Sequence, residues 1–279
     1  MKVHFIGIGG IGLSALARFL NFDGHEVCGS DMKSSPITKA LEEEGIKVSC
    51  PQDAKNIKDD IDLVIYSAAV TDENPELIEA RLKQIRTLSR KEALPIILGD
   101  KKNYCVAGAH GKSTTTAMLA SILQSTTLIG AISKDFGSNF RYVDDLVAFE
   151  ADESDASFLL SNPYCAIVTN AEPEHMEYYH YDYDKFYESY ERFLSLAKKR
   201  VVNGEDKDIQ KLKIEDAVYL YPSKDIKNLC YTLKDNQPCT RFDLKDLGTF
   251  EVWGFGFHMA SNASLAILAA LNELDVETI

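Results

Sequence analysis

Residues 104–123 read YCVAGAHGKSTTTAMLASIL, and this stretch decides the fold class. Apolar residues 104–107 predict a buried strand, residues 108–111 a glycine loop, and residues 113–123 a helix. In such a loop the backbone amides cradle phosphates, a lysine reaches the β- and γ-phosphates, and the next hydroxyl binds Mg²⁺. We therefore expect Lys112 and Ser113 to serve a bound nucleotide. Val106 breaks the strict G-x-x-x-x-G-K-[ST] pattern, so a chance match is the alternative.

A second glycine loop lies at the start of the chain. Residues 2–8 read as a short apolar strand, GIGGIG follows at 7–12, and Leu13, Leu16 and Leu20 continue at helical spacing. Asp31 comes about 20 residues after the last glycine, where dinucleotide-binding proteins keep a ribose-binding acid. The pattern predicts a phosphorylated ligand at the N-terminus of a helix. It leaves open whether that ligand is NAD or another nucleotide, or whether the loop is only a tight turn.

Strands and helices alternate along the whole chain, which predicts an α/β protein: an N-terminal Rossmann-like parallel sheet followed by a P-loop-type α/β ATP-binding domain. A polar break at 99–103 predicts domains at 1–99 and 103–279. Further strands are expected at 26–28, 63–66, 146–149, 166–169 and 217–221, helices at 36–44, 74–82, 184–197 and 260–274, and a hairpin at 240–257.

The chain has 279 residues and a formal net charge of −13, with most of the acidic excess after residue 99. This charge argues against a nucleic-acid partner and against a polybasic membrane surface. No apolar run reaches the roughly 20 residues of a membrane helix, and the first residues do not resemble a signal peptide. Six cysteines without metal-ligand spacing indicate free thiols in a reducing compartment. We expect a soluble, cytoplasmic protein without membrane insertion; its oligomeric state is left open.

Carboxylates follow two of the strands expected in the second domain. Glu150 and Asp152 come directly after 146–149, and His175 follows the strand at 166–169. Carboxyl ends of parallel strands face the crevice where ligands bind, and carboxylate oxygens suit Mg²⁺. We assign Glu150 to the metal, whereas Asp152 is equally well explained as a helix cap.

Taken together, these motifs resemble those of a Mur ligase. The resemblance rests on GIGGIG at 7–12, SAAV at 67–70, NPE at 74–76, AGAHGKSTTT at 107–116, EADESDASFL at 150–159 and VTNAEPEHM at 168–176. It covers essentially the whole chain. It is strongest to the member that joins L-alanine to UDP-N-acetylmuramate.

The resemblance implies an ADP-forming ligase of peptidoglycan synthesis with ATP and Mg²⁺ as cofactors and an acyl-phosphate intermediate. The implied catalytic residues are Lys112, Glu150 and His175, with Ser113, Glu150 and His175 on the metal. The implied ATP-binding residues are Gly108, Ala109, His110, Gly111, Lys112, Ser113, Thr114, His258 and Asn262. UDP-N-acetylmuramate, rather than NAD, would occupy Gly7, Gly9, Gly10, Gly12, Ser30, Asp31 and Ser67. The family's third, amino-acid-binding domain would be absent, and we expect a chain without it to be inactive alone.

Three other functions are weighed against this one. A sister Mur ligase that attaches a recycled peptide to the same UDP-sugar would share most of the motifs. A nucleotide-binding protein without ligase activity, such as a P-loop switch ATPase, would use only the second loop. An NAD-dependent oxidoreductase would use the first loop and Asp31 but would leave Gly108, Lys112 and Glu150 without a role.

Overall fold

The computed structural model describes all 279 residues, which form two compact units. One unit comprises residues 1–99 together with 128–142, and the other comprises residues 100–127 and 143–279. The association of 128–142 with the first unit was not expected from the sequence. No helix combines the length and the apolar character that a membrane crossing requires.

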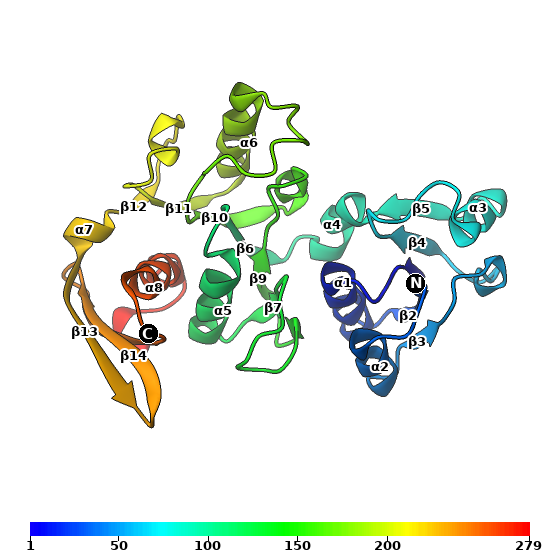
Figure 1. Cartoon of the computed structure of the whole chain (residues 1–279), viewed down its shortest axis with the longest axis horizontal. Helices are drawn as coiled ribbons and strands as arrows, with labels where there is room; N and C mark the ends of the chain where they lie inside the picture. Colours follow the sequence, from blue (N-terminus) through cyan, green and yellow to red (C-terminus); the bar gives the residue numbers. More distant parts are fainter. The chain divides into compact units, whose positions relative to one another are not determined.

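The first unit is built on a five-stranded sheet with the order β3-β2-β1-β4-β5, in which all neighbouring strands are parallel. Helix α1 contacts both α2 and α4, and these three helices lie on one face of the sheet, with α3 on the other (Figure 1). The expected Rossmann-like sheet is confirmed. Its elements are β1 Lys2–Ile6, α1 Ile11–Phe22, β2 Glu26–Ser30, α2 Pro36–Glu43, β3 Lys47–Ser49, the short 3-10 helix η1 Ala54–Asn56, β4 Leu63–Tyr66, α3 Pro75–Leu82, β5 Arg86–Ser89 and α4 Arg90–Leu98.

Residues 128–142 are fixed to this unit by side chains of α1. The Arg18 guanidinium, only 5% exposed, donates from Nη1 to Oδ1 of Asn139 at 2.7 Å and from Nε to Glu44 at 2.6 Å. Phe140 packs edge-on against Phe19, with ring centroids 6.2 Å apart. A polar anchor and an aromatic contact therefore bind this segment to a helix more than a hundred residues earlier in the chain.

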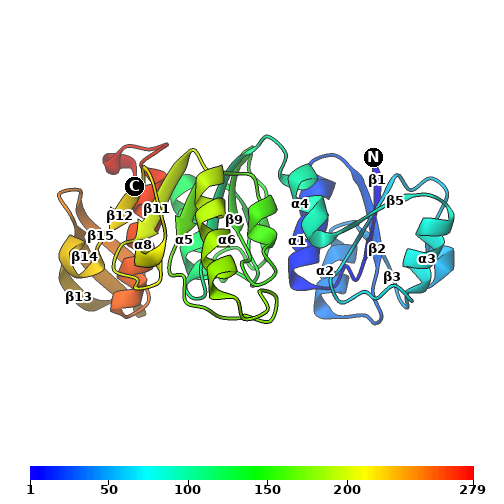
Figure 2. The ribbon, with the colours of Figure 1, turned by 90° about the horizontal axis from the view of Figure 1, so that it is seen from above.

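A larger sheet has the order β12-β11-β10-β6-β9-β7-β8, and its central pairs are parallel. All of its strands except β8 and the last residue of β7 belong to the second unit. Its core packs α5 and α8 against β6, β10 and β11 (Figure 2). The elements that follow α4 along the chain are β6 Lys102–Ala107, α5 Lys112–Leu123, β7 Thr126–Leu128, β8 Phe140–Arg141, β9 Leu146–Glu150, η2 Ser157–Leu160, β10 Pro163–Val168, α6 Tyr183–Leu196, β11 Lys199–Asn203, η3 Ile209–Lys211, β12 Val218–Leu220, α7 Pro222–Asp225, β13 Ile226–Lys234, β14 Gln237–Leu244, β15 Gly248–Trp253, α8 Phe257–Ala270 and η4 Val276–Thr278.

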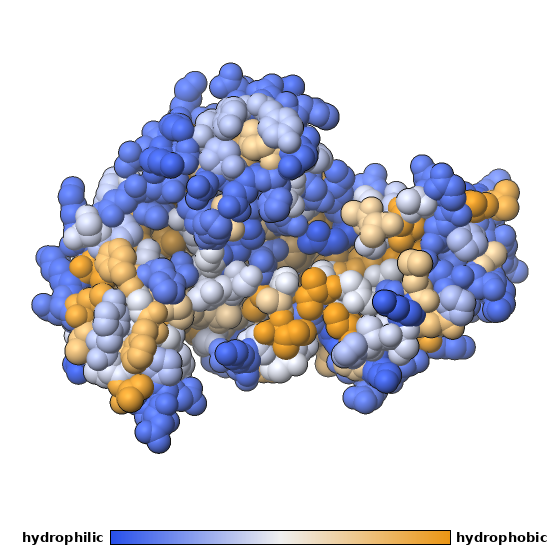
Figure 3. Space-filling view, viewed as in Figure 1, coloured by the Kyte–Doolittle hydropathy of each residue, from blue (hydrophilic) through white to orange (hydrophobic).

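The expected hairpin near the end of the chain is confirmed, but it belongs to a three-stranded antiparallel sheet, β13-β14-β15. Buried Phe242 and Leu244 join the core on the side of α8. Tyr231, Leu233 and Trp253 of the same sheet are exposed, and Figure 3 shows apolar residues gathered over the β13–β14 region. β13 has exposed residues along most of its length, so it lacks the apolar pattern by which a buried strand is found in a sequence.

Candidate functional site

The loop between β6 and α5 requires glycine at two positions. Gly108 has φ of +134° and Gly111 has φ of +85°, a region that residues with a side chain rarely adopt. A side chain at Gly108 would place its Cβ 2.3 Å from Oγ1 of Thr169, which leaves no room for it. The backbone therefore passes against the end of β10 at a distance that only glycine allows.

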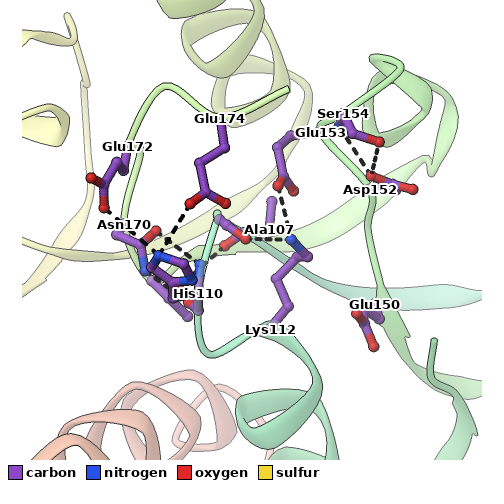
Figure 4. A network of polar contacts seen from close by, with 12 residues as sticks. Ala107, His110, Lys112, Glu150, Asp152, Glu153, Ser154, Asn170, Glu172 and Glu174 are labelled. Carbon is purple, nitrogen blue, oxygen red and sulfur yellow. Dashed lines mark hydrogen bonds and ion pairs between the residues drawn. The ribbon is translucent and has the colours of Figure 1, made fainter. Parts of the chain in front are cut away.

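Residues at the end of β10 hold the loop in shape. Thr169 Oγ1 and Asn170 Nδ2 donate to the carbonyl oxygen of His110 at 2.6 and 2.7 Å, and the His110 amide donates back to Asn170 Oδ1 at 3.1 Å. The His110 ring faces Glu174 at 3.4 Å and Glu172 at 3.8 Å (Figure 4). Residues 168–170 (VTN) thus hold the glycine loop by hydrogen bonds, a role that the sequence analysis did not assign to them.

The N-terminus of α5 has the properties of an anion site. Its N-cap is Gly111, which offers no side-chain acceptor to the first amides of the helix. Those amides carry the positive end of the helix dipole, and Ala109, Ser113 and Thr114 lie in the same loop or first turn. A loop that excludes side chains and leads into an uncapped helix N-terminus fits a nucleotide phosphate.

The amine of Lys112 is held by two oxygens. Nζ donates to the Gly108 carbonyl at 2.6 Å and to Oε1 of Glu153 at 2.8 Å (Figure 4). The Glu153 side chain is only 5% exposed. The sequence analysis assigned Glu150 and Asp152 in this stretch and gave Glu153 no role. Strand β9 ends at Glu150, and Glu153 turns toward the loop.

The expected metal ligands are brought together only in part. Ser113 Oγ donates to Oε1 of Glu150 at 3.0 Å, so these two oxygen groups are adjacent. Hydroxyl and carboxylate oxygens are the donor types that Mg²⁺ prefers, and the pair fits this ion. His175 is exposed in the loop after β10, with φ of +51°. No group of three or more His, Cys, Asp and Glu side chains is placed to hold a metal. Asp152 Oδ1 accepts from the amide and hydroxyl of Ser154, as a turn-capping residue does.

Two of the residues that the resemblance assigns to ATP binding, His258 and Asn262, lie on α8. Asn262 is close to the glycine loop, because a Cβ on Gly111 would lie 2.8 Å from its Oδ1. His258 is exposed in the first turn of α8. The close contact of Asn262 with Gly111 gives α8 a direct part in shaping the phosphate loop.

The first glycine loop is built in a similar way, within the other unit. Gly7 has φ of +81°, and a Cβ there would lie 3.1 Å from Cβ of Ser67. The Gly9 amide donates to Oδ2 of Asp31 at 2.9 Å, and the N-cap of α1 is Gly10, which offers no side-chain cap. The Arg90 guanidinium lies against Gly12, with Nε 3.1 Å from the position of a Cβ.

Ser30, the last residue of β2, supports this loop by hydrogen bonds. Its carbonyl oxygen accepts from the amides of Gly7 and Ile8 at 2.8 and 3.0 Å. Its hydroxyl is fully buried and donates to Glu76 at 2.5 Å. The side chain of Ser30 is therefore engaged inside the unit, and its backbone carbonyl holds the turn. The sequence analysis had placed it with the substrate-binding residues.

Each unit thus carries a strand, a glycine loop and an uncapped helix N-terminus, the arrangement that is typical of phosphate-binding α/β proteins. Comparison with known families agrees with this class. The model of the Mur ligase family, catalytic domain, matches residues 2–102, and the Mur ligase middle domain matches residues 106–270. The chain belongs to the Mur ligase family.

Individual relatives point to one branch. The chain is 58% identical over 279 residues to the UDP-N-acetylmuramate–L-alanine ligase of Campylobacter curvus, covering 100% of this chain and 64% of the relative. It is 51% identical to that of Helicobacter pylori, of which it covers 62%. The crystal structure of the Thermotoga maritima UDP-N-acetylmuramate–alanine ligase superposes with a TM-score of 0.85 at 29% identity, over 98% of this chain and 65% of that one. The chain therefore spans less than two thirds of the length of these relatives.

Proposed function

We propose that this chain serves an ATP-dependent, ADP-forming ligase that joins L-alanine to the carboxylate of UDP-N-acetylmuramate in peptidoglycan synthesis, in the cytoplasm. The observation that carries the proposal is the loop at Gly108–Lys112, with its two positive-φ glycines, its lysine and the adjacent Ser113–Glu150 pair. The substrates are proposed from the activity for which the relatives are named.

ATP would place its phosphates along the amides of residues 109–114, with Lys112 at the β- and γ-phosphates. Mg²⁺ would be held by Ser113 and Glu150, and it would supply positive charge to the transferring phosphoryl group. In phosphoryl transfer the protein contributes mainly positioning and charge neutralisation. In a chain of net charge −13, Lys112 is the one Lys or Arg of the loop at 108–112, so it would carry most of the protein's share of that neutralisation.

The first glycine loop would bind the UDP part of the sugar substrate. Gly9 and Asp31 are hydrogen-bonded across the loop, and Arg90 adds a positive charge beside Gly12. The diphosphate would accept from the N-terminal amides of α1, and the ribose hydroxyls would face Asp31. The arrangement suits a nucleoside diphosphate that carries a further group on its terminal phosphate.

The choice of ligand for the first loop is tested by calorimetric titration of the chain with UDP-N-acetylmuramate and, separately, with NADH. We expect saturable binding of the UDP-sugar that Asp31→Asn weakens, and no binding of NADH. A matched control is Asp23→Asn, an acid in the turn after α1 that is remote from the loop. NADH binding without UDP-sugar binding would refute the assignment and favour an oxidoreductase.

A further inference from the structure

Lys112 already has an anionic partner inside the protein. Its Nζ is 2.8 Å from Oε1 of Glu153 and 2.6 Å from the carbonyl oxygen of Gly108, and the side chain is 17% exposed. In Figure 4 Glu153 reaches Lys112 from the chain that follows β9, while Glu150 lies apart from this pair. The amine that a phosphate would need is thus folded back onto its own loop and neutralised by a carboxylate.

The two members of this ion pair differ in their other partners: Lys112 has a second hydrogen-bond acceptor, whereas the Glu153 carboxylate depends on Lys112 alone. Its Oε2 is buried and has no hydrogen-bond partner, so Lys112 is the one cation that balances the carboxylate. Burial raises the pKa of Glu153, and the favourable effect of Lys112 offsets this rise only in part. The backbone around it is fixed, because the Tyr179 hydroxyl donates to the Glu153 carbonyl oxygen at 2.6 Å. The carboxylate is thus attached to an anchored backbone at a position that is almost fully buried.

We infer, on the basis of the proposed function, that Glu153 is a resident counterion of Lys112 that competes with the β- and γ-phosphates of the nucleotide and so sets nucleotide affinity. Each binding event exchanges a Lys112–carboxylate pair for a Lys112–phosphate pair and leaves a buried carboxylate without its cation. That cost weakens the hold on both ATP and ADP. It therefore favours release of the product nucleotide. Glu153 is a positioning residue in this role: it acts through Lys112 and touches neither substrate.

The test is a double-mutant cycle with nucleotide affinity as its readout. Glu153→Gln keeps the size of the side chain and removes its charge. Dissociation constants for ATP, ADP and AMP are measured by calorimetry on the 279-residue chain, in the wild type, in Glu153→Gln, in Lys112→Met and in the double variant. A matched control is Glu172→Gln, which makes the same charge change near the same loop without contacting Lys112.

Glu153→Gln is expected to tighten ATP and ADP binding about tenfold. This is the free energy of one charge-assisted hydrogen bond, which Lys112 no longer has to break with Glu153 before it binds a phosphate. AMP, which lacks the phosphates that Lys112 addresses, changes less than about twofold. In the Lys112→Met background the same substitution changes ATP affinity less than about threefold, because the competition no longer exists. Glu172→Gln changes ATP affinity less than about twofold, as a solvent-screened charge does.

The outcomes separate this role from the proposed function. If the wild-type chain binds no ATP, the proposed function fails and the role of Glu153 fails with it. If ATP binds but Glu153→Gln does not tighten it, or if Glu172→Gln or the Lys112→Met background gives an equal gain, only the counterion role is refuted. Should Glu153→Gln not fold, Glu153→Asp replaces it. One methylene shorter, it is expected to tighten ATP binding about threefold, and no gain refutes the role.

Discussion

Replacing Glu76 with alanine tests a buried polar network of the first unit. Glu76 is fully buried near the start of α3 and accepts from His4 Nε2 at 3.0 Å, Ser30 Oγ at 2.5 Å, Asn56 Nδ2 at 2.7 Å and the Asp53 amide at 3.1 Å. These donors come from β1, β2 and the η1 segment, so one carboxylate joins three parts of the unit. Ser30 in turn supports the first glycine loop. Glu76→Ala would leave all four donors without this acceptor.

The expected loss of stability is estimated from the protonation of His4, which is hydrogen-bonded to Glu76. Burial lowers the pKa of His4, but its hydrogen bonds to Cys28 and Glu76 outweigh that effect and raise the pKa from 6.5 to about 9. At about 1.4 kcal/mol for each pH unit, this displacement represents about 3 kcal/mol of preference for the charged ring, to which Cys28 and Glu76 both contribute. Breaking a buried ion pair by removing one partner costs about 3–5 kcal/mol, in agreement. We therefore expect Glu76→Ala to destabilise the first unit by about 3–5 kcal/mol.

The assay is urea unfolding followed by far-ultraviolet circular dichroism, with hydrogen exchange read by mass spectrometry to locate the loss. The chain has one tryptophan, Trp253, so its fluorescence reports separately on the second unit. The control is Glu79→Ala on the same helix, whose carboxylate is 30% exposed and makes a 3.5 Å pair with Lys83. Such a surface pair contributes about 0.3–0.5 kcal/mol.

Glu76→Ala should speed exchange in β1, β2 and α3 and leave the Trp253 transition near its wild-type midpoint. Equal effects of the two alanine variants would refute the reasoning, because they would show that the four hydrogen bonds do not stabilise the unit.

Three further predictions follow from the same contacts. The pKa of His4 is raised in the folded state, so its contribution to stability is full below pH 6.5 and is lost as the pH rises through about 9. Urea unfolding midpoints measured across that pH range should therefore fall in the wild type and change less in His4→Gln. Gly108→Ala should lower both stability and ATP affinity, since its Cβ would lie 2.3 Å from a neighbouring hydroxyl, whereas Gly137→Ala, with no atom within 4 Å, should cost only the strain of its φ of +66° and leave ATP affinity unchanged by calorimetry. Ser113→Ala and Glu150→Gln should each raise the Mg²⁺ concentration needed for ATP binding by about tenfold without changing UDP-sugar affinity, and an unchanged Mg²⁺ requirement would remove both residues from the metal site.

The sequence predicted the two glycine loops and their flanking strands because those features are local. A strand, a glycine and an apolar helix lie within about 20 residues, and the geometry of each loop follows from the positive φ that its glycines adopt. Helix α4 was missed although Ser89 and Glu92 form a capping box at its start, because Pro95 inside it obscures the helical pattern. That capping signal was present in the sequence and could have found the helix.

Other features depend on contacts that no local pattern contains. The anchoring of residues 128–142 depends on Arg18 meeting Asn139, 121 residues apart in the sequence. Glu153 was missed because its direction is set by the end of β9 and by the hydroxyl of Tyr179, which comes from a distant loop. Strand β13 has an exposed face and pairs with β14 through its backbone, so composition alone does not reveal it.

The central claim, that each unit carries its own nucleotide site and that Lys112 serves the second, is tested most directly by titrating ATP with Mg²⁺ and UDP-N-acetylmuramate into the wild type and Lys112→Met. The control is Lys185→Met, an exposed lysine of α6 paired only with Asp182. We predict that Lys112→Met weakens ATP binding at least about tenfold, the loss of one charge-assisted hydrogen bond, and leaves UDP-sugar affinity within about twofold. Unchanged ATP affinity, or an equal loss for both ligands in a folded variant, would contradict it.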